Sequence, residues 1–340
     1  MSATVVEPKI PQHESEVGRP VVTGVQKIPL FAPLVLPGFI LLALIVQKLW
    51  AGREGAVEAA SYTRLIIICL GLAIAVAAFQ FFYQPAREKI GHAFPIMAGF
   101  VGLIVLWQVI TTGLSLLPLP YFPGPSRVWQ SLLDDHALLF DSTWHSLFLL
   151  ISGYALGTAI ALVSGTCIGW FGHARYWGMP LLKIIGPIPA TAWIPLAMVI
   201  SPSMKLASVL VIALSVWFPV TMLTASGIAN TRASYLDVAR TLGARQGYLI
   251  FRVAIPAAMP SIFIGLFMGL GASFLTLIVA ETVGVHSGLG YYINWQQGYA
   301  EYGKVYAALV IMAVFFSTIM TLLFKVRDRV LVWQKGVIKW

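Results

Sequence analysis

The feature of this sequence that most constrains its fold is a series of long apolar runs separated by short polar segments. A helix needs about 20 mostly apolar residues to cross the roughly 30 Å hydrocarbon core of a bilayer. The chain is 59% hydrophobic and only 10% charged, whereas about a quarter of the residues of a soluble domain are charged. We therefore expect an all-α polytopic membrane protein with spans near residues 31–50, 64–83, 94–117, 142–171, 180–200, 205–229, 257–282 and 303–324.

The run at residues 180–200 differs from the others because it contains Pro187, Pro189 and Pro195. Proline removes a backbone donor and clashes with the preceding helical turn. Backbone groups freed within a membrane need partners from neighbouring helices. This run is therefore predicted to be an interrupted span.

The distribution of lysine and arginine indicates how the spans are oriented. Most of these 22 residues fall in alternate segments between the runs, including four arginines within residues 230–256. Cytoplasmic segments of membrane proteins are enriched in both residues. The N-terminus, residues 230–256 and the C-terminus are thus predicted to be cytosolic, and this orientation accounts for the net charge of +9. The charge does not by itself indicate a nucleic-acid partner.

The two ends of the chain are polar. Residues 1–29 are proline-rich and contain no apolar stretch ahead of the first span, which argues against a cleaved signal peptide. We expect them to form a mostly disordered cytosolic tail, and residues 326–340 to form a basic cytosolic tail.

A polar segment, residues 230–256, separates two of the apolar runs. Ser234 and Asp237 have the spacing of a capping box, so a short helix should begin near Tyr235. Gly243 should end that helix, since glycine takes the left-handed conformation without steric cost. These signals predict a short helix followed by a hinge.

A second amphipathic helix should follow the hinge, with apolar side chains interleaved with arginines: Arg245, Tyr248, Ile250, Phe251 and Arg252. Pro256 should then open the next span, because a proline in the first turn loses no helical hydrogen bond. Short helices with apolar and basic faces are suited to a groove of a partner protein.

Other local signals concern helix ends and helix packing. Ser126 is predicted to cap a short helix on the outer membrane surface, and Asp141 to cap the fourth span. Small residues four positions apart allow close approach of helices in lipid, and three glycine pairs have this spacing: Gly153 with Gly157, Gly165 with Gly169, and Gly265 with Gly269.

Residues 230–256 also resemble the EAA loop of the membrane subunits of bacterial ABC importers. Asp237-Val238-Ala239 occupies the positions of E-A-A, and its first two residues, Asp and Val, depart from that pattern. Gly243 occupies the position of the family's glycine, and Val253-x-Ile255-Pro256 that of I-x-L-P. The stretches FPGPSRVW, PLLKIIGPIPATAWIPL and VAETVGVHSGLGYYI are similar to further motifs of one branch of these permeases. That branch imports nitrate, aliphatic sulfonates, taurine, bicarbonate and certain vitamin precursors.

The resemblance covers about residues 94–335 and implies a six-helix type I ABC importer permease core at residues 94–325. Residues 30–93 would add two N-terminal transmembrane helices. The resemblance also implies a bacterial inner-membrane location and a second permease copy, so that the permease is a homodimer. It further implies an external substrate-binding protein and ATPase subunits that use ATP and Mg on the cytosolic side. The coupling residues it implies are Ser234, Asp237, Ala239, Gly243, Arg245 and Pro256. Two departures within the core are Gly186, where the family has arginine, and ISPSMK in place of W-F-G-x-G.

Enzymatic and ATP-independent functions are the alternatives. The chain has no G-x-x-x-x-G-K-[ST] phosphate loop, its six histidines are scattered, and H-E-x-x-H and G-x-S-x-G are absent. Cys69 and Cys167 fall in different spans and resemble packing residues, so no catalytic residue, metal site or bound cofactor is expected. A secondary transporter would usually carry carboxylates at the membrane midplane, and Glu281 is the one serious candidate for that role.

Candidate residues of a substrate path are polar or amphipathic residues within the core spans: Thr191, Trp193, Ser215, Trp217, Ser273 and Thr276. Glu281 is expected at the outer mouth of the path, because Gly284, Gly288 and Gly290 allow the chain to turn back towards the membrane. It would act there in gating or structure, and the alternative is that it only reaches interfacial water. The sequence does not name the solute.

Overall fold

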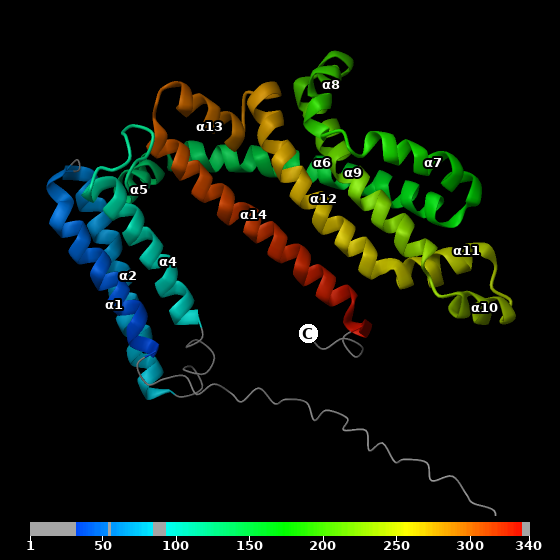
Figure 1. Ribbon diagram of the computed structural model, residues 1–340, viewed down its shortest axis with the longest axis horizontal. Helices are drawn as coiled ribbons and strands as arrows, with labels where there is room; N and C mark the ends of the chain where they lie inside the picture. Colours follow the sequence, from blue (N-terminus) through cyan, green and yellow to red (C-terminus); the bar gives the residue numbers. More distant parts are fainter. Residues whose placement is uncertain (1–31, 54–55, 84–92, 335–340) are drawn as a thin grey trace, which may run out of the picture. The chain divides into compact units, whose positions relative to one another are not determined.

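The computed structural model describes residues 32–53, 56–83 and 93–334, and within these ranges all regular structure is helical (Figure 1). Seven helices of the described residues are long and apolar enough to cross a membrane: Pro33–Trp50, Val57–Phe82, Ala93–Gly113, His136–Trp170, Met204–Ala229, Gln246–Gly284 and Tyr302–Val330. An eighth span would be formed by Gly172–Ile185 together with Ala190–Ile200, which are bent by 89° at the break between them. The all-α polytopic fold is confirmed, and so is the interruption of the run at residues 180–200.

The described chain divides into two compact units. The first contains residues up to Ile45 together with Ile66–Val105, and the second contains Val46–Leu65 and the chain from Leu106 onward. Helices α1 (Ala32–Trp50), α2 (Ala56–Phe82) and α4 (Ala93–Gln108) supply the first unit. The first unit thus includes most of α4 besides parts of α1 and α2. The predicted tail at residues 1–29 lies outside the described residues, as does the end of the C-terminal tail at residues 335–340.

The second unit holds most of the helices. After the 3-10 turn Ala51–Arg53 and the π-turn Val109–Gly113, these are α5 (Pro125–Asp134), α6 (His136–Trp170), α7 (Gly172–Ile185), the 3-10 turn η3 (Ala190–Trp193), α8 (Ile194–Ile200), α9 (Met204–Ala229), α10 (Ala233–Thr241), α11 (Gln246–Tyr248), the π-turn η4 (Leu249–Ala254), α12 (Ile255–Gly284), α13 (Leu289–Gly298) and α14 (Tyr302–Val330). A 3-10 turn, Val332–Gln334, follows α14.

Helices α6, α9 and α12 pack closely along their length, as the glycine pairs predict. A Cβ added at Gly153 would lie 2.5 Å from Ile212 Cγ2, and one at Gly165 would lie 2.7 Å from Thr224 Cβ. On the other side of α9, a Cβ at Gly265 would lie 3.1 Å from Val220 Cα. Small residues therefore bring the three helices into contact, as is usual where lipid removes the hydrophobic drive for helix association.

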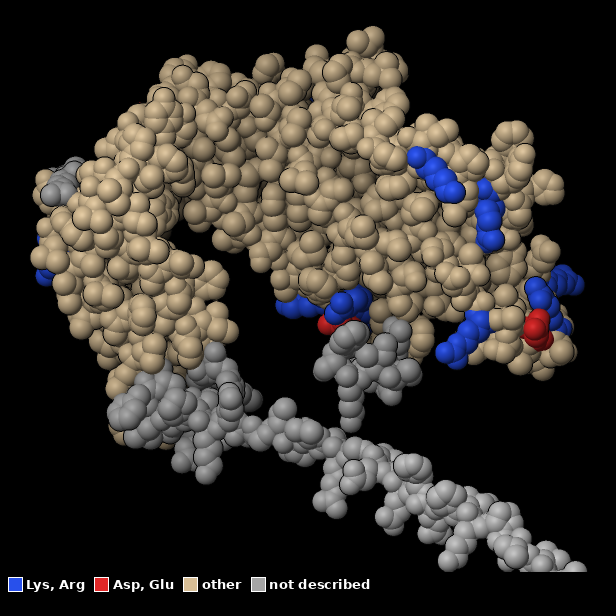
Figure 2. Space-filling view, viewed as in Figure 1, with Lys and Arg blue, Asp and Glu red and all other residues tan. Residues whose placement is uncertain are grey.

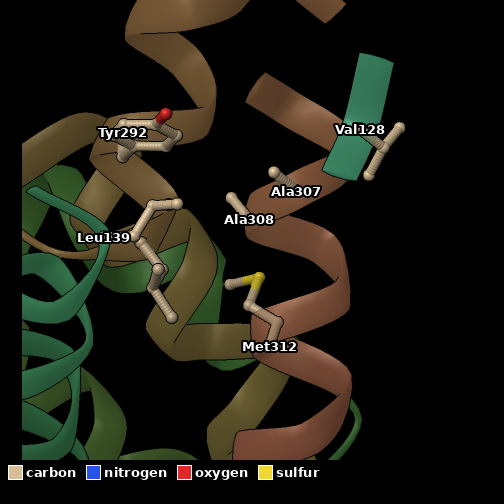
Figure 3. Close-up of a cluster of buried hydrophobic side chains, with 7 residues drawn as sticks. Val128, Leu139, Tyr292, Ala307, Ala308 and Met312 are labelled. Carbon is tan, nitrogen blue, oxygen red and sulfur yellow. The ribbon is translucent and has the colours of Figure 1, made fainter. Parts of the chain in front are cut away.

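A cluster of buried side chains joins four helices at one end of this unit (Figure 3). In Figure 3, Met312 and the alanines of α14 lie opposite Leu139 of α6, with Tyr292 of α13 and Val128 of α5 nearby. The cluster consists of Val128, Leu139, Leu289, Tyr292, Ala307, Ala308 and Met312. It fixes α5 and α13 to the two long helices α6 and α14.

Two predicted helix caps are wrong. Helix α5 begins two residues earlier than expected, with Gly124 as N-cap and Pro125 at the first position, which proline favours because it has no N–H to satisfy. Ser126 is instead buried, with 1% of its surface exposed. Helix α6 begins at His136, so Asp141 lies within it and does not cap it.

The two cysteines differ in their surroundings. Cys167 is half-buried on α6, whereas Cys69 is exposed on α2. Cys69 therefore does not pack inside this chain as expected.

Candidate functional site

The first candidate region is α10 and the turn that follows it. The helix begins at Ala233 with Arg232 as its N-cap, and no side chain caps it. The predicted capping box is therefore wrong, because Ser234 and Asp237 both lie inside the helix. The Asp237 carboxylate instead accepts a hydrogen bond from Arg240 Nη1 at 3.0 Å, one turn further along.

Gly243 ends α10 as predicted. Its φ is +81°, and its N–H donates to the carbonyl of Arg240 at 2.9 Å. The N–H of Ala244 donates to the carbonyl of Ala239 at 3.0 Å. Together these two bonds form a Schellman motif, which requires a left-handed residue at this position. A Cβ at Gly243 would meet no atom within 4 Å, so the demand for glycine comes from the backbone conformation.

The chain after the turn differs from the prediction of a separate second helix. Residues Gln246–Gly284 form one continuous apolar helix, in which α11, η4 and α12 follow each other without a break. Pro256 lies in the first turn of α12, as predicted, but α12 continues directly from the π-turn η4 and does not begin a separate helix. The π-turn η4 ends at Ala254, directly before α12.

The α10 region presents a mixed apolar and basic surface at one end of α12. No residue of α10 is buried, and Leu242 and Phe251 are 82% and 68% exposed. The exposed arginines of this region are Arg232, Arg240, Arg245 and Arg252. Figure 2 shows basic side chains gathered at this end of the unit, with a single acidic patch among them. Exposed large apolar groups interleaved with arginines are typical of a protein–protein contact.

The second candidate region lies at the opposite end of α12, next to α13 (Figure 1). Glu281 is fully buried there, with 0% of its surface exposed. Its Oε1 accepts a hydrogen bond from Ser146 Oγ of α6 at 2.6 Å, and its Oε2 accepts one from the N–H of Gly290 at 2.8 Å. The Ser146 hydroxyl in turn accepts a hydrogen bond from the N–H of Leu289 at 2.8 Å. Because this carboxylate is buried and hydrogen-bonded within the chain, the structure disagrees with the alternative in which the Glu281 side chain reaches interfacial water.

Two glycines make room for this carboxylate. Gly288 has a φ of +103°, and a Cβ there would lie 2.8 Å from Glu281 Oε2 and overlap the rest of the carboxylate. A Cβ at Gly290 would lie 2.6 Å from the carbonyl oxygen of Ile278. The predicted tight turn is therefore confirmed, and Glu281, Ser146 and the turn at residues 288–290 hold α6, α12 and α13 together.

A polar contact that the sequence did not indicate lies on the same side of the unit. Asp135 Oδ2 accepts a hydrogen bond from the Tyr292 hydroxyl at 2.8 Å and lies 3.1 Å from Lys304 Nζ. Burial and the neighbouring Asp135 carboxylate raise the pKa of the Tyr292 phenol, so its hydroxyl remains a donor. These contacts connect α13 to the start of α6 and of α14.

The six path candidates separate into two groups. The hydroxyls of Ser215, Ser273 and Thr276 donate to carbonyls of their own helices, Ile212, Leu270 and Ala272 respectively. Trp217 Nε1 donates to Ser164 Oγ at 3.0 Å. Each of these four residues thus has a hydrogen-bond acceptor within the chain, and their part in a substrate path stays a prediction. Thr191 and Trp193 lie in η3, inside the interrupted span.

Comparison with known proteins identifies the family. The family described as "Binding-protein-dependent transport system inner membrane component" matches residues 153–331. A Bacillus subtilis (strain 168) permease named for aliphatic sulfonates transport, SsuC, is 30% identical over 68% of this chain and 84% of its own length. A protein of Brucella abortus (strain 2308) named as an ABC transporter permease is 32% identical over 67% of this chain and 91% of its own length. The bicarbonate transport system permease protein CmpB of Synechococcus elongatus is 29% identical over 74% of this chain and 92% of its own length.

The matched region begins in α6 and extends just past the end of α14, so it includes both the α10 turn and the Glu281 turn. It does not include helix α5 or about the first half of α6. The chain therefore belongs to the family of binding-protein-dependent transport system inner membrane components.

Proposed function

We propose that this chain is the membrane-spanning permease subunit of an ATP-driven importer and forms the translocation path for a small oxyanion or sulfonate. The observation that carries the proposal is the α10 turn, whose left-handed Gly243 stands at the glycine position of the EAA pattern. The substrate class is supported by relatives named for aliphatic sulfonates and for bicarbonate. Import of a vitamin precursor by the same machinery is the alternative within this function.

In this proposal α10 and the turn after it dock the ATPase subunits. Leu242 and Phe251 provide apolar contact area, and the nearby arginines provide charge. The coupling residues are those expected from the family pattern: Ser234, Asp237, Ala239, Gly243, Arg245 and Pro256. ATP and Mg would be bound by the partner, because this sequence has no phosphate loop of its own and is proposed to have no enzymatic activity.

The two ends of α12 would then lie on opposite sides of a bacterial inner membrane. The α10 end and both termini are cytosolic in this proposal, and α13 with the Glu281 turn is on the outer side. The external binding protein would approach that outer side, and a second copy of the chain would complete the path. Residues 94–325 would form the permease core, with residues 30–93 as an addition to it.

Glu281 is proposed to act in gating or structure and not in substrate binding. Its carboxylate is buried and hydrogen-bonded to Ser146 and Gly290, and a negative charge would repel an anionic solute. Because the carboxylate holds α13 against α6, a change at Glu281 is expected to loosen the outer side of the path.

Reconstitution tests the proposed function. The chain is co-expressed with its ATPase and binding-protein partners, placed in proteoliposomes, and assayed for uptake of a radiolabelled alkanesulfonate and of bicarbonate. Uptake that needs ATP, the ATPase and the binding protein supports the proposal. Uptake by the chain alone, without ATP or an ATPase, would instead identify an ATP-independent secondary transporter.

A further inference from the structure

The indole N–H of Trp193 is a buried donor without an acceptor. Among the described residues no atom lies in position to accept a hydrogen bond from Trp193 Nε1. Trp217, by contrast, donates its indole N–H to Ser164. A buried donor that loses water and gains no acceptor destabilises the folded state, so such a group in a native protein calls for an explanation.

The location of Trp193 suggests that explanation. It ends η3, the short turn that follows the 89° break after Ile185 and leads into α8, and η3 packs against α9 and α12. Residues 186–200 contain no lysine, arginine, aspartate or glutamate, and three of their backbone nitrogens belong to prolines and carry no hydrogen. The side-chain donors of this segment are therefore uncharged, and Trp193 Nε1 is one of them.

An indole N–H is well suited to a transported anion. It donates and cannot accept, so it favours an oxygen-rich ligand over a cationic one. It is also uncharged, so it would bind an anion less tightly than lysine or arginine, which permits release on the other side. The atom is covered in this conformation, so the proposal requires that another state of an alternating-access cycle exposes it to the path.

We propose that Trp193 donates its indole N–H to an oxygen of the transported anion as the anion passes the interrupted span. This inference rests on the proposed importer function. It assigns Trp193 a role in substrate recognition that the other tryptophan of the path candidates, Trp217, does not share.

The test uses the complete transporter in proteoliposomes with saturating binding protein, so that uptake depends on steps after delivery. The probes are a radiolabelled alkanesulfonate and radiolabelled bicarbonate. Trp193→Phe keeps the aromatic ring and removes the donor, Trp193→His restores an N–H, and Trp177→Phe is the matched control, since Trp177 is 76% exposed on α7. We expect Trp193→Phe to lower uptake by about tenfold, the value of one hydrogen bond, while the complex with the ATPase still assembles.

Trp193→His should recover part of that uptake, and Trp177→Phe should match the wild type. Wild-type uptake by Trp193→Phe would overturn the inference. Equal losses of uptake in Trp193→Phe and Trp193→His, with the complex intact, would also overturn the inference. The shape of the side chain, and not its N–H donor, would then determine uptake. If the wild-type complex takes up neither anion, the proposed substrate class fails, and the inference fails with it.

Discussion

Ser146 and Glu281, 135 residues apart in the chain, are joined by a 2.6 Å hydrogen bond from the serine hydroxyl to the carboxylate. The same hydroxyl accepts a hydrogen bond from the backbone of Leu289, so one serine connects α6 to both α12 and the start of α13. The second carboxylate oxygen accepts a hydrogen bond from Gly290. A single buried carboxyl group thus determines how the chain turns between α12 and α13.

Replacement of Glu281 by glutamine should loosen this turn. The amide offers one acceptor oxygen where the carboxylate offers two, and hydrogen bonds to charged groups contribute about 1.5–3 kcal/mol against about 0.5–1.5 kcal/mol for neutral ones. We expect Glu281→Gln to raise basal ATPase activity of the complex about two- to tenfold, or to weaken its dependence on the binding protein. The ligand affinity of the binding protein itself should not change.

ATPase assays with and without the binding protein check this expectation. Glu301→Gln is the matched control, because Glu301 is partly exposed and its carboxylate lies 3.8 Å from Arg127. If Glu281→Gln and Glu301→Gln both behave like the wild type, Glu281 has no part in gating.

Gly288 should be more sensitive to substitution than a glycine in open surroundings. Gly288→Ala places a Cβ against the Glu281 carboxylate and forces a left-handed backbone on alanine, which alone costs about 1–2 kcal/mol. The midpoint of thermal unfolding in detergent should fall by at least about 2–4 °C. Gly298→Ala is the control, since a Cβ there meets nothing within 4 Å. Equal midpoints for the two variants would show that the turn tolerates a side chain.

The sequence predicted those features that depend on local chemistry. Apolar runs located the spans, glycine pairs located the α6–α9–α12 contacts, and Gly243 located the end of α10. Helix starts were predicted less well: Gly124 and not Ser126 is the N-cap of α5, and the chain before Pro256 is already helical through α11 and η4. The partners of Glu281 were not identified, because Ser146 is distant in sequence and only the folded helices bring it close.

The additional N-terminal helices are expected to add stability or a docking surface, with transport residing in the core. A chain that starts near Ala93 should insert and keep substrate-stimulated ATPase activity with its partners. The truncation removes Gln47, whose amide accepts a hydrogen bond from buried Gln108. Gln108→Leu should therefore be included in a second version, so that no amide donor loses its acceptor. Well-expressed versions that lack all stimulated activity would place part of the transport function in the removed helices.

The most direct test of the coupling assignment is the substitution Gly243→Val. A β-branched residue in the left-handed conformation raises the free energy of this turn by on the order of 1 kcal/mol or more. The substitution would break the Schellman motif that sets the orientation of α10. Gly247→Val is the control, because Gly247 lies in α11 without a positive φ and with open space around it. We predict that Gly243→Val inserts normally but loses most uptake and most co-purification of the ATPase, while Gly247→Val keeps both. Unchanged uptake and unchanged ATPase co-purification in Gly243→Val would contradict the assignment of α10 as the coupling element.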